Sequence, residues 1–445
     1  MNSSKVVGNT IESVANDKYP ADWDIQRFRH VFLFGKGLSI TKDNLEDEGV
    51  PTVNYGEVHS KYGFELIPSK HALKCVSADY LKTGKSALLK FGDFVFADTS
   101  EDLQGSGNFT YLNGDEQVFA GYHTVIARLR PKWRESLDVR FLAYLLDSAS
   151  FRTQVRKRVK GVKVYSITQS ILKDTYLPIP PKNLQGKIAR FLEEKVSKVD
   201  EAIAIKQKQI ELLKERKQII IQQAVTQGLN PDAPMKDSGV DWIGEIPEHW
   251  GIVRFKNLFT QSRLPVRKGD GVVTSYRDGQ VTLRSNRRVG GYTEAILEGG
   301  YQGIRKGQLV LNSMDAFEGA IGVSDSDGKC TPEYVICDPI NRVDVSQYYF
   351  AYLLREMALA KYIQVICNAV RQRAVRIRYN NLAPLFMVVP PVKEQENIVS
   401  FIEKESAKLD AGIKHLNEQI SKLKEYKATL INSAVTGKIK VMELK

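Results

Sequence analysis

A stretch of fifty residues occurs twice in this chain, and it constrains the fold more than any other feature of the sequence. Residues 180–229 align without a gap to residues 390–439, and nineteen of the fifty aligned residues are identical. Two unrelated segments of ordinary composition would share roughly three identities. The chain therefore carries an internal duplication, and its fold must accommodate both copies.

Each copy has the periodicity of a long amphipathic helix. Apolar residues recur at alternating steps of three and four, Pro-Pro pairs open both copies, and Gly228 and Gly437 stand at their ends. About 42 residues at 1.5 Å each give a helix of roughly 60 Å, whose apolar stripe needs a partner. The predicted coiled-coil seam consists of Leu192, Val199, Ile203, Ile210, Leu213, Ile220, Ile402, Leu409, Ile413, Leu416, Ile420, Leu423 and Leu430.

The partner of each helix is expected to be the other copy. A globular segment separates the two, so the second helix can return alongside the first, and we predict an antiparallel intramolecular coiled coil. Lys206, Lys217 and Lys427 fall at seam positions, where polar residues usually fix register at some cost in stability. The alternative, a solvated charged helix without a partner, is disfavoured because a matching helix is present in the same chain.

A second, more divergent repeat precedes each helix. YPADWDIQRFRHVF at residues 19–32 resembles IPEHWGIVRFKNLF at 246–259, with Trp23 aligned to Trp250. Short strand signals and a helix containing Ala-Tyr-Leu-Leu follow in both segments. We therefore predict an α+β chain with a pseudo-twofold internal repeat. Its expected parts are a flexible N-terminal arm (1–19), a first mixed α/β domain (20–179), a long helix (180–229), a linker (230–246), a second α/β domain (247–389), a long helix (390–439) and a C-terminal tail (440–445).

Composition is that of a globular protein of several units. The chain has 445 residues, of which 42% are hydrophobic, and no apolar run long enough to span a membrane. No signal-peptide pattern opens it, so we expect a cytoplasmic protein with no membrane association. Four cysteines without CxxC spacing indicate neither a zinc site nor a disulfide framework.

The formal net charge of +12 indicates a polyanionic partner, because the basic residues are concentrated. Residues 152–163 carry six basic residues and no acidic one, and residues 371–378 carry four arginines at the corresponding place of the second repeat. A charge run is usually only a solvated face, but its recurrence at equivalent places favours phosphate and base contacts. The predicted DNA-binding residues are Arg152, Arg156, Lys157, Arg158, Lys160, Lys163, Tyr165, Arg277, Arg284, Arg287, Arg288, Arg371, Arg373, Arg376 and Arg378.

The sequence shows no pattern of catalytic residues. It lacks the Asn/Asp-Pro-Pro-Tyr/Phe loop of amine methyltransferases, a phosphate-binding loop, HExxH and GxSxG. We therefore expect neither catalytic nor metal-binding nor cofactor-binding residues in this chain.

Three motifs carry a family resemblance. DSGVDWIGEIPEHW at 237–250, the Pro-Pro pair followed by Glu394-Gln395, and AVTGKI at 434–439 are similar to those of specificity subunits of type I restriction-modification enzymes. The similarity extends from about Tyr19 to Val441, in the same order of domain and helix.

This resemblance implies two target-recognition domains, each reading half of a bipartite, asymmetric DNA site, with the coiled coil setting the spacer. The implied partners are double-stranded DNA, two methyltransferase subunits that bind S-adenosylmethionine, and motor-nuclease subunits that use ATP and Mg²⁺. A free-standing methyltransferase or nuclease is disfavoured because its motifs are missing. A coiled-coil adaptor with incidental basic loops remains the alternative.

Overall fold

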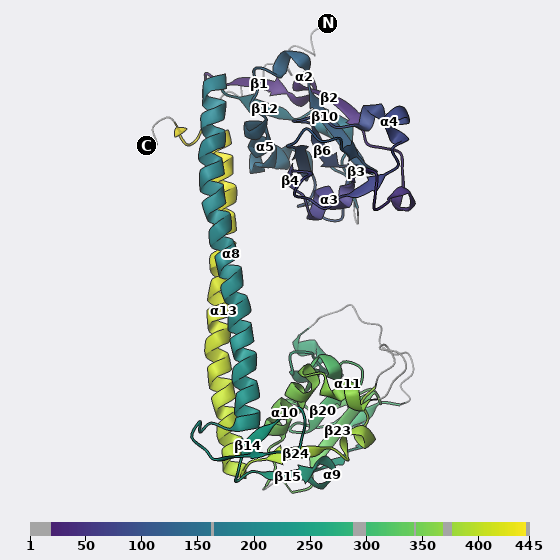
Figure 1. Ribbon diagram of the computed structural model, residues 1–445, viewed down its shortest axis with the longest axis vertical. Coiled ribbons are helices and arrows are strands. Elements are labelled where there is room, and N and C mark those ends of the chain that lie inside the picture. The colour runs from purple at the N-terminus through teal and green to yellow at the C-terminus, as the bar shows by residue number, and fades with distance from the viewer. Residues whose placement is uncertain (1–18, 162–163, 288–299, 342–343, 368–375, 442–445) are drawn as a thin grey trace. The chain divides into compact units, whose positions relative to one another are not determined.

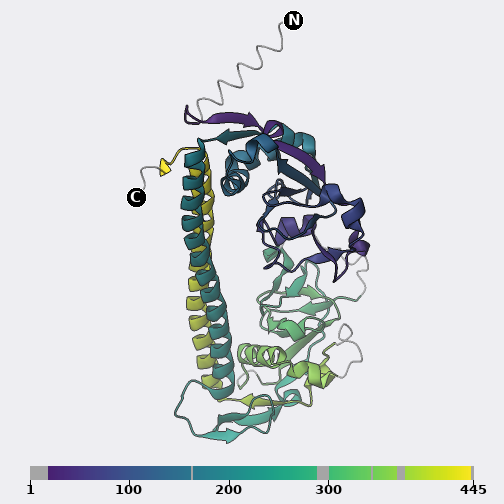
Figure 2. The same ribbon diagram turned by 45° about the horizontal axis from the view of Figure 1, so that its top comes forward.

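The computed structural model describes residues 19–161, 164–287, 300–341, 344–367 and 376–441. It divides into two compact units, which we describe separately (Figures 1 and 2). Unit 1 comprises residues 1–206 and 418–445, and unit 2 comprises residues 207–417. Each unit therefore holds one α/β domain together with half of each long helix.

Unit 1 is built around a five-stranded sheet of order β2-β10-β6-β8-β4, antiparallel except for the β4–β8 pair. Its elements are β1 (Asp24–Arg27), α2 (Phe28–Val31), β2 (Phe32–Lys36), β3 (Val50–Val53), α3 (Tyr55–Ser60), β4 (Phe64–Leu66), β5 (Lys74–Val76), α4 (Tyr80–Thr83), β6 (Phe94–Ala97), β7 (Thr99–Ser100), β8 (Phe109–Leu112), β9 (Phe119–Ala120), β10 (Thr124–Leu129), α5 (Val139–Asp147), α6 (Ala149–Arg156), β11 (Tyr165–Ser166), α7 (Gln169–Lys173), β12 (Tyr176–Ile179) and the first part of α8 (Lys182–Gln227).

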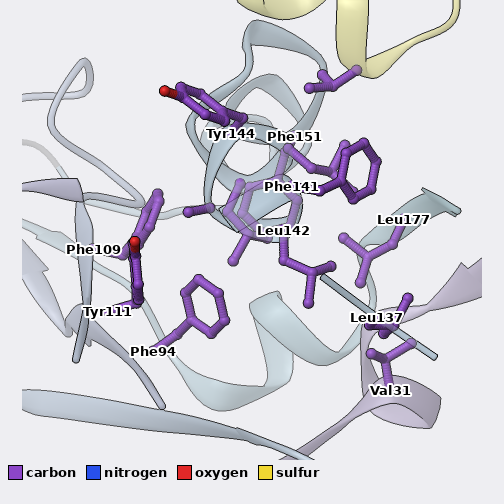
Figure 3. Packing of buried hydrophobic residues seen from close by; sticks show 14 of the residues in the cluster. Val31, Phe94, Phe109, Tyr111, Leu137, Phe141, Leu142, Tyr144, Phe151 and Leu177 are labelled. Carbon is purple, nitrogen blue, oxygen red and sulfur yellow. The ribbon is translucent and has the colours of Figure 1, made fainter. Parts of the chain in front are cut away.

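Both faces of this sheet are covered, and the period of two along a strand determines which residue lies on which face. Phe94 and Phe96 of β6 join one core cluster, whereas Val95 and Ala97 join another on the opposite face. Figure 3 shows the first cluster, in which Phe94 and its neighbours meet the side chains of α5 and α6. All four residues of β6 are buried, as expected for a central strand.

Unit 2 repeats this plan with a four-stranded sheet of order β16-β23-β20-β21, on which α10 packs. Residues 230–246 contain strands that form a small hairpin, β13 with β14. The elements are β13 (Met235–Asp237), β14 (Glu245–Pro247), β15 (Gly251–Arg254), α9 (Phe255–Leu258), β16 (Phe259–Gln261), β17 (Val273–Ser275), β18 (Val281–Leu283), β19 (Gln302–Ile304), β20 (Leu309–Asn312), β21 (Ile321–Val323), β22 (Gly328–Cys330), β23 (Tyr334–Pro339), α10 (Gln347–Leu359), α11 (Tyr362–Ile366), α12 (Tyr379–Leu382), β24 (Phe386–Val389) and the first part of α13 (Val392–Val435).

The two long helices pair in opposite directions within each unit, which confirms the predicted antiparallel coiled coil (Figure 1). In unit 1, Lys427 Nζ lies 2.7 Å from a carboxylate oxygen of Asp200. In unit 2, Lys217 Nζ lies 2.7 Å from Asp410, and these two ion pairs occupy equivalent positions of the repeat. Lys206 Nζ donates to Gln419 Oε1 at 2.6 Å. The lysines of the seam thus contact the opposite helix, and these contacts favour the observed register.

The seam residues differ in burial because a two-helix coil leaves its flanks open to solvent. Near α8's C-terminal end, Ile221 is buried and Ile220 only half-buried, since α8 there enters the core of unit 2. The buried members of the predicted seam are Leu192, Val199, Ile203, Ile210, Ile402, Ile420 and Leu430. The half-buried members are Leu213, Ile220, Leu409, Ile413, Leu416 and Leu423.

The C-terminal end of each long helix packs on the tryptophan of a repeat. Gly437 (φ 73°) follows α13 in unit 1, and a Cβ there would lie 3.2 Å from the Trp23 ring. Gly228 (φ 77°) follows α8 in unit 2, and a Cβ there would lie 3.2 Å from Trp250. Glycine is favoured at both positions because it adopts a positive φ without strain and leaves room for the indole.

A buried glutamine fixes the N-terminal end of each long helix. The N–H of Asp138, the N-cap of α5, donates to Gln185 Oε1 at 2.9 Å. Gln185 Nε2 donates to the carbonyl oxygens of Ser136 at 3.2 Å and Pro180 at 2.9 Å. Gln395 makes the three equivalent bonds in unit 2, and both side chains are at most 1% exposed. These side chains tie each α/β domain to its long helix.

We expect Gln185→Ala to lower the free energy of unfolding by about 2–4 kcal/mol, because it leaves several buried polar groups without a partner. Urea denaturation followed by circular dichroism measures this change. Gln207→Ala is the matched control, since Gln207 is an exposed glutamine of the same helix and its replacement should cost less than about 0.5 kcal/mol. Equal stability of the two variants would contradict this role.

Glu356 of α10 is a buried carboxyl group, 6% exposed, to which Gln218 Nε2 of α8 donates a hydrogen bond. Burial raises the pKa of Glu356 from 4.5 to about 7, although the hydrogen bond and the charge of Arg355 oppose the shift. The folded state therefore holds this proton more tightly than the unfolded chain does. Stability from this group is present below pH 4.5 and is lost as the pH rises through 7.

We expect Glu356→Gln to remove this pH dependence, because an amide keeps the hydrogen bond but does not ionise. The free energy of unfolding of the variant, measured against pH in urea, should exceed that of the wild type at pH 8 by on the order of 3 kcal/mol. Parallel profiles for the two proteins would refute the assignment.

Candidate nucleic-acid interface

Three of the predicted basic residues of unit 1 lie in the loop between α6 and β11, which we call the basic loop. Lys157, Arg158 and Lys160 follow the C-terminal end of α6 and are exposed or partly exposed. The Arg158 guanidinium donates to the carbonyl oxygen of Gln154 at 2.8 Å, within the same turn. No ion pair to these three residues is found in the described part of the chain. Their charges are therefore open to an external anion.

Two other predicted residues of unit 1 are engaged inside the domain. Arg152 lies 2.7 Å from Asp147 and 2.6 Å from Asn108 Oδ1, and its side chain is only 16% exposed. Arg156 donates to the carbonyl oxygen of Gln104 at 2.6 Å, and burial lowers the pKa of its guanidinium. These contacts join α6 to the loops beside β7 and β8, so both arginines have a structural role.

Tyr165 lies in β11, which pairs with β7 in the register Tyr165 to Ser100. The N–H of Ser166 donates to the carbonyl oxygen of Lys160 at 3.3 Å. Lys160 of the basic loop is therefore bonded to β11, which β7 in turn anchors to the domain.

Three of the predicted arginines of unit 2, Arg277, Arg284 and Arg287, lie on the hairpin of β17 and β18 and just beyond it. Arg277 forms ion pairs with Asp315 (2.9 Å) and Glu318. Arg284 donates to Thr274 Oγ1 at 3.3 Å. Other contacts of the hairpin join Arg287 to Asp278 at 2.9 Å and to the face of Tyr276, 4.1 Å from the ring centroid.

Arg376 and Arg378 immediately precede α12. Arg376 Nη1 lies 2.6 Å from Glu333 Oε1, and Arg378 is exposed at the N-cap of α12. Exposed pairs of this kind are weak, so a phosphate can replace the carboxylate at small cost. The remaining predicted residues, Lys163, Arg288, Arg371 and Arg373, lie outside the residues that the structure describes.

A polar hollow of about 590 Å³ in unit 1 was not predicted from the sequence. His123 lies on its rim with φ 53°, a left-handed conformation uncommon outside glycine, and its Nδ1 is 3.2 Å from Asp98 Oδ1. Comparing the flanks of the duplicated strands could have drawn attention to the turn before β10. The lining residues are Lys36, Gly37, Leu38, Ser39, Ile40, Asp98, Tyr122, His123, Thr124, Val125, Ser166, Ile167, Thr168, Gln169 and Ser170.

The cysteine, histidine and acidic side chains form no metal centre within the described ranges, where no group of three or more of them is arranged to hold an ion. All four cysteines, Cys75, Cys330, Cys337 and Cys367, are buried as free thiols, and burial raises the pKa of each. In the same part of the chain, no helix has the length and apolar character needed to cross a bilayer.

Comparison with known proteins gives consistent matches. Residues 20–215 match the family model of the type I restriction modification DNA specificity domain. The EcoBI specificity subunit of Escherichia coli is 23% identical over 330 residues, which cover 68% of this chain and 66% of that one. The MjaVIII specificity subunit of Methanocaldococcus jannaschii is 27% identical over 243 residues, covering 54% and 50%. The chain thus spans between half and two thirds of the length of these relatives.

The fold gives the same result. A chain from a structure on complex assembly and conformational transition of the type I R-M system superposes with a TM-score of 0.64 at 16% identity, covering 95% of this chain and all of that one. Together with the mixed α/β domains and long helices of this chain, this superposition confirms the predicted fold class. Residues 20–215 thus match the type I restriction modification DNA specificity domain, and the chain is similar in sequence to type I specificity subunits, the family that its motifs resemble.

Proposed function

We propose that this chain is the DNA-sequence-specificity subunit of a type I restriction-modification complex and performs no catalysis itself. The observation that carries the proposal is the duplicated architecture. Each unit clamps an α/β domain to the long helices through the same buried glutamine and the same tryptophan–glycine contact, while the basic surface loops differ. A shared scaffold with different charged loops suits two DNA-recognition domains of different sequence specificity.

Each domain would read one half of a bipartite, asymmetric site on double-stranded DNA. Exposed lysine and arginine side chains would hold phosphates, and those contacts fix position without carrying sequence information. Because the two domains differ in their loops, the two half-sequences are expected to differ.

The coiled coil would set the spacer between the half-sites and dock two methyltransferase subunits. S-adenosylmethionine would be bound by those subunits, and ATP and Mg²⁺ by motor-nuclease subunits, with no cofactor held by this chain. The long helices support this role, because α8 and α13 run uninterrupted over 46 and 44 residues.

A filter-binding assay tests the proposal against a coiled-coil adaptor. The full chain, with and without methyltransferase subunits, is titrated against DNA carrying the motif mapped from methylated adenines in the genome. Binding that prefers this motif over scrambled DNA supports the specificity subunit. Assembly of the proteins without any sequence preference would support the adaptor.

Neutralising the basic loop should weaken the salt dependence of DNA binding. For the complex bearing Lys157→Ala, Arg158→Ala and Lys160→Ala, the slope of log affinity against log salt concentration should fall by roughly 0.9 for each phosphate that the variant no longer binds. Lys214→Ala, which alters an α8 lysine outside the basic loop, should leave the slope unchanged. If the triple variant assembled normally and kept the wild-type slope, these residues would not face DNA.

A further inference from the structure

Three segments meet in the same way beside the sheet of each unit. In unit 1, the N–H of Asp98 donates to the carbonyl oxygen of His123 at 3.1 Å, and the N–H of Ile167 donates to that of Asp98 at 2.7 Å. These bonds hold together the end of β6, the turn before β10 and the strand leading into α7.

Unit 2 reproduces both bonds. The N–H of Ser313 donates to the carbonyl oxygen of Glu333 at 2.9 Å, and the N–H of Ile377 donates to that of Ser313 at 3.2 Å. The turn before β10 therefore corresponds to the turn before β23, and His123 corresponds to Glu333. Ser166, one residue before Ile167, corresponds to Arg376.

The side chains on this common backbone differ in charge and hydrogen-bonding pattern. His123 contacts Asp98 in unit 1, with ring nitrogen and carboxylate oxygen 3.2 Å apart. In unit 2, Arg376 contacts Glu333 at 2.6 Å. The side chains of His123 and Arg376 are 59% and 45% exposed, so packing does not dictate their identity.

A buried pair elsewhere provides a contrast. In unit 1, Arg128 donates a hydrogen bond to Asp93. In unit 2, Asp338 occupies the position of Arg128 and Gln308 that of Asp93, and Gln308 donates to Asp338. Asp93 and Gln308 are 2% and 4% exposed, so that exchange is explained by complementary packing inside each domain. Packing does not explain the difference between the two exposed pairs, so contact with a ligand is the better explanation of their identity.

The surroundings of the exposed pair in unit 1 suit the edge of a base. The hollow beside it offers an acceptor at Asp98 and a donor at Lys36, which has no ion-pair partner among the described residues. Carboxylates accept from the cytosine amino group, and lysine or arginine donates to guanine O6 and N7. Ser166 lines the hollow and is bonded to Lys160 of the basic loop, so phosphate contacts at the loop would bring bases here.

The backbone at His123 also indicates a constrained site. Its φ of 53° costs energy for a residue with a Cβ, and such conformations persist where the surrounding structure enforces them, often in binding sites. The turn is fixed by Thr124 Oγ1, which donates to the carbonyl oxygen of Gly121 at 2.7 Å. The ring is thereby held at the rim of the hollow.

We propose that the polar hollow of unit 1 is where this domain reads base edges of its half-site, with His123 and Asp98 as specificity-determining residues. Glu333 and Arg376 have the same role at the equivalent place of unit 2. This inference rests on the proposed DNA-recognition function and assigns the reading to particular side chains.

The test uses the full chain in complex with its methyltransferase subunits. His123→Asn is the first variant, because asparagine also tolerates a left-handed backbone but presents different donors. Methylated adenines are mapped by single-molecule sequencing in a host without other adenine methylation. Methylation at sites with one substitution in the half read by unit 1 should rise about tenfold relative to the native site, since a base contact discriminates by roughly that factor. The other half should stay unchanged.

Matched variants complete the design. Glu333→Gln should relax only the half read by unit 2, and Lys157→Ala should lower methylation equally at all sites. Asp98→Asn replaces His123→Asn if the latter prevents assembly, with the same expected relaxation. Unchanged motifs, or a uniform loss in the His123 and Asp98 variants, would overturn this inference alone. A wild-type complex that methylates no bipartite motif would remove the proposed function and this inference with it.

Discussion

Replacing residues 247–386 with the corresponding domain of another specificity subunit is expected to change one half of the methylated DNA sequence and leave the other half unaltered. With two or more mismatched base pairs at about 1–3 kcal/mol each, methylation of the native site should fall at least about thirtyfold. The physical reason is that the domain is attached by backbone and framework contacts, which do not depend on its surface loops.

The structure defines how the chimera should be joined. The second junction lies at β24, whose Phe386 pairs with Arg254 of β15, so the incoming domain must supply a strand in the β15 register. It must also supply the tryptophan equivalent to Trp250, on which Gly228 packs. Gln395 lies outside the exchanged segment and stays in the recipient. Its Oε1 can accept a hydrogen bond from the backbone N–H of the incoming residue at the α10 N-cap, as it does from Ser346.

Exchange of residues 20–176 is the reciprocal control, because it should change only the other half of the motif. Single-molecule sequencing of methylated adenines reads both halves in one measurement. Loss of both half-specificities in a chimera that assembles and unfolds like the wild type would show that the domains do not read independently.

Lengthening both long helices by one heptad is expected to abolish methylation of the native site and to move it to a site with the same half-sequences and a longer spacer. Seven residues add about 10 Å at 1.5 Å per residue, close to three base pairs. Three base pairs also correspond to a rotation of roughly 100° around the duplex, which displaces the second half-site from its domain.

The cross-helix contacts identify where the insertions belong. Lys206 bonds to Gln419, so heptads between residues 206 and 207 and between 417 and 418 lie at the same level of the coil and keep the seam in phase. The same points separate the two compact units, so both α/β domains keep all their own contacts. An insertion in α8 alone is the control, since it displaces Lys217 from Asp410 and should impair assembly. A doubly extended complex that methylated the native spacing at the wild-type rate would disprove the spacer role.

The sequence by itself determined the helical frame. Neither of the two predicted helices can bury its apolar seam residues without a partner helix, so their pairing followed from the periodicity. The observed helices span Lys182–Gln227 and Val392–Val435. Local signals also marked the α/β character of both domains, because alternating apolar residues and turn residues are read over a few positions.

Only the tertiary structure decided how the charged residues are used. Arg152 and Lys157 belong to the same basic run, yet Arg152 is bonded to Asp147 and Asn108 while Lys157 is exposed. The partners of Arg152 come from other segments of the chain, so the distribution of charges along the sequence does not reveal them.

The polar hollow was beyond the sequence for the same reason. Lys36, Asp98, His123 and Ser166 come from four separate segments, and none of them belongs to a recognisable motif where it stands in the chain. Strand pairing and a left-handed turn bring them together, and these depend on long-range contacts. Periodicity fixes which elements form, whereas the side chains that share a surface are chosen by how those elements pack.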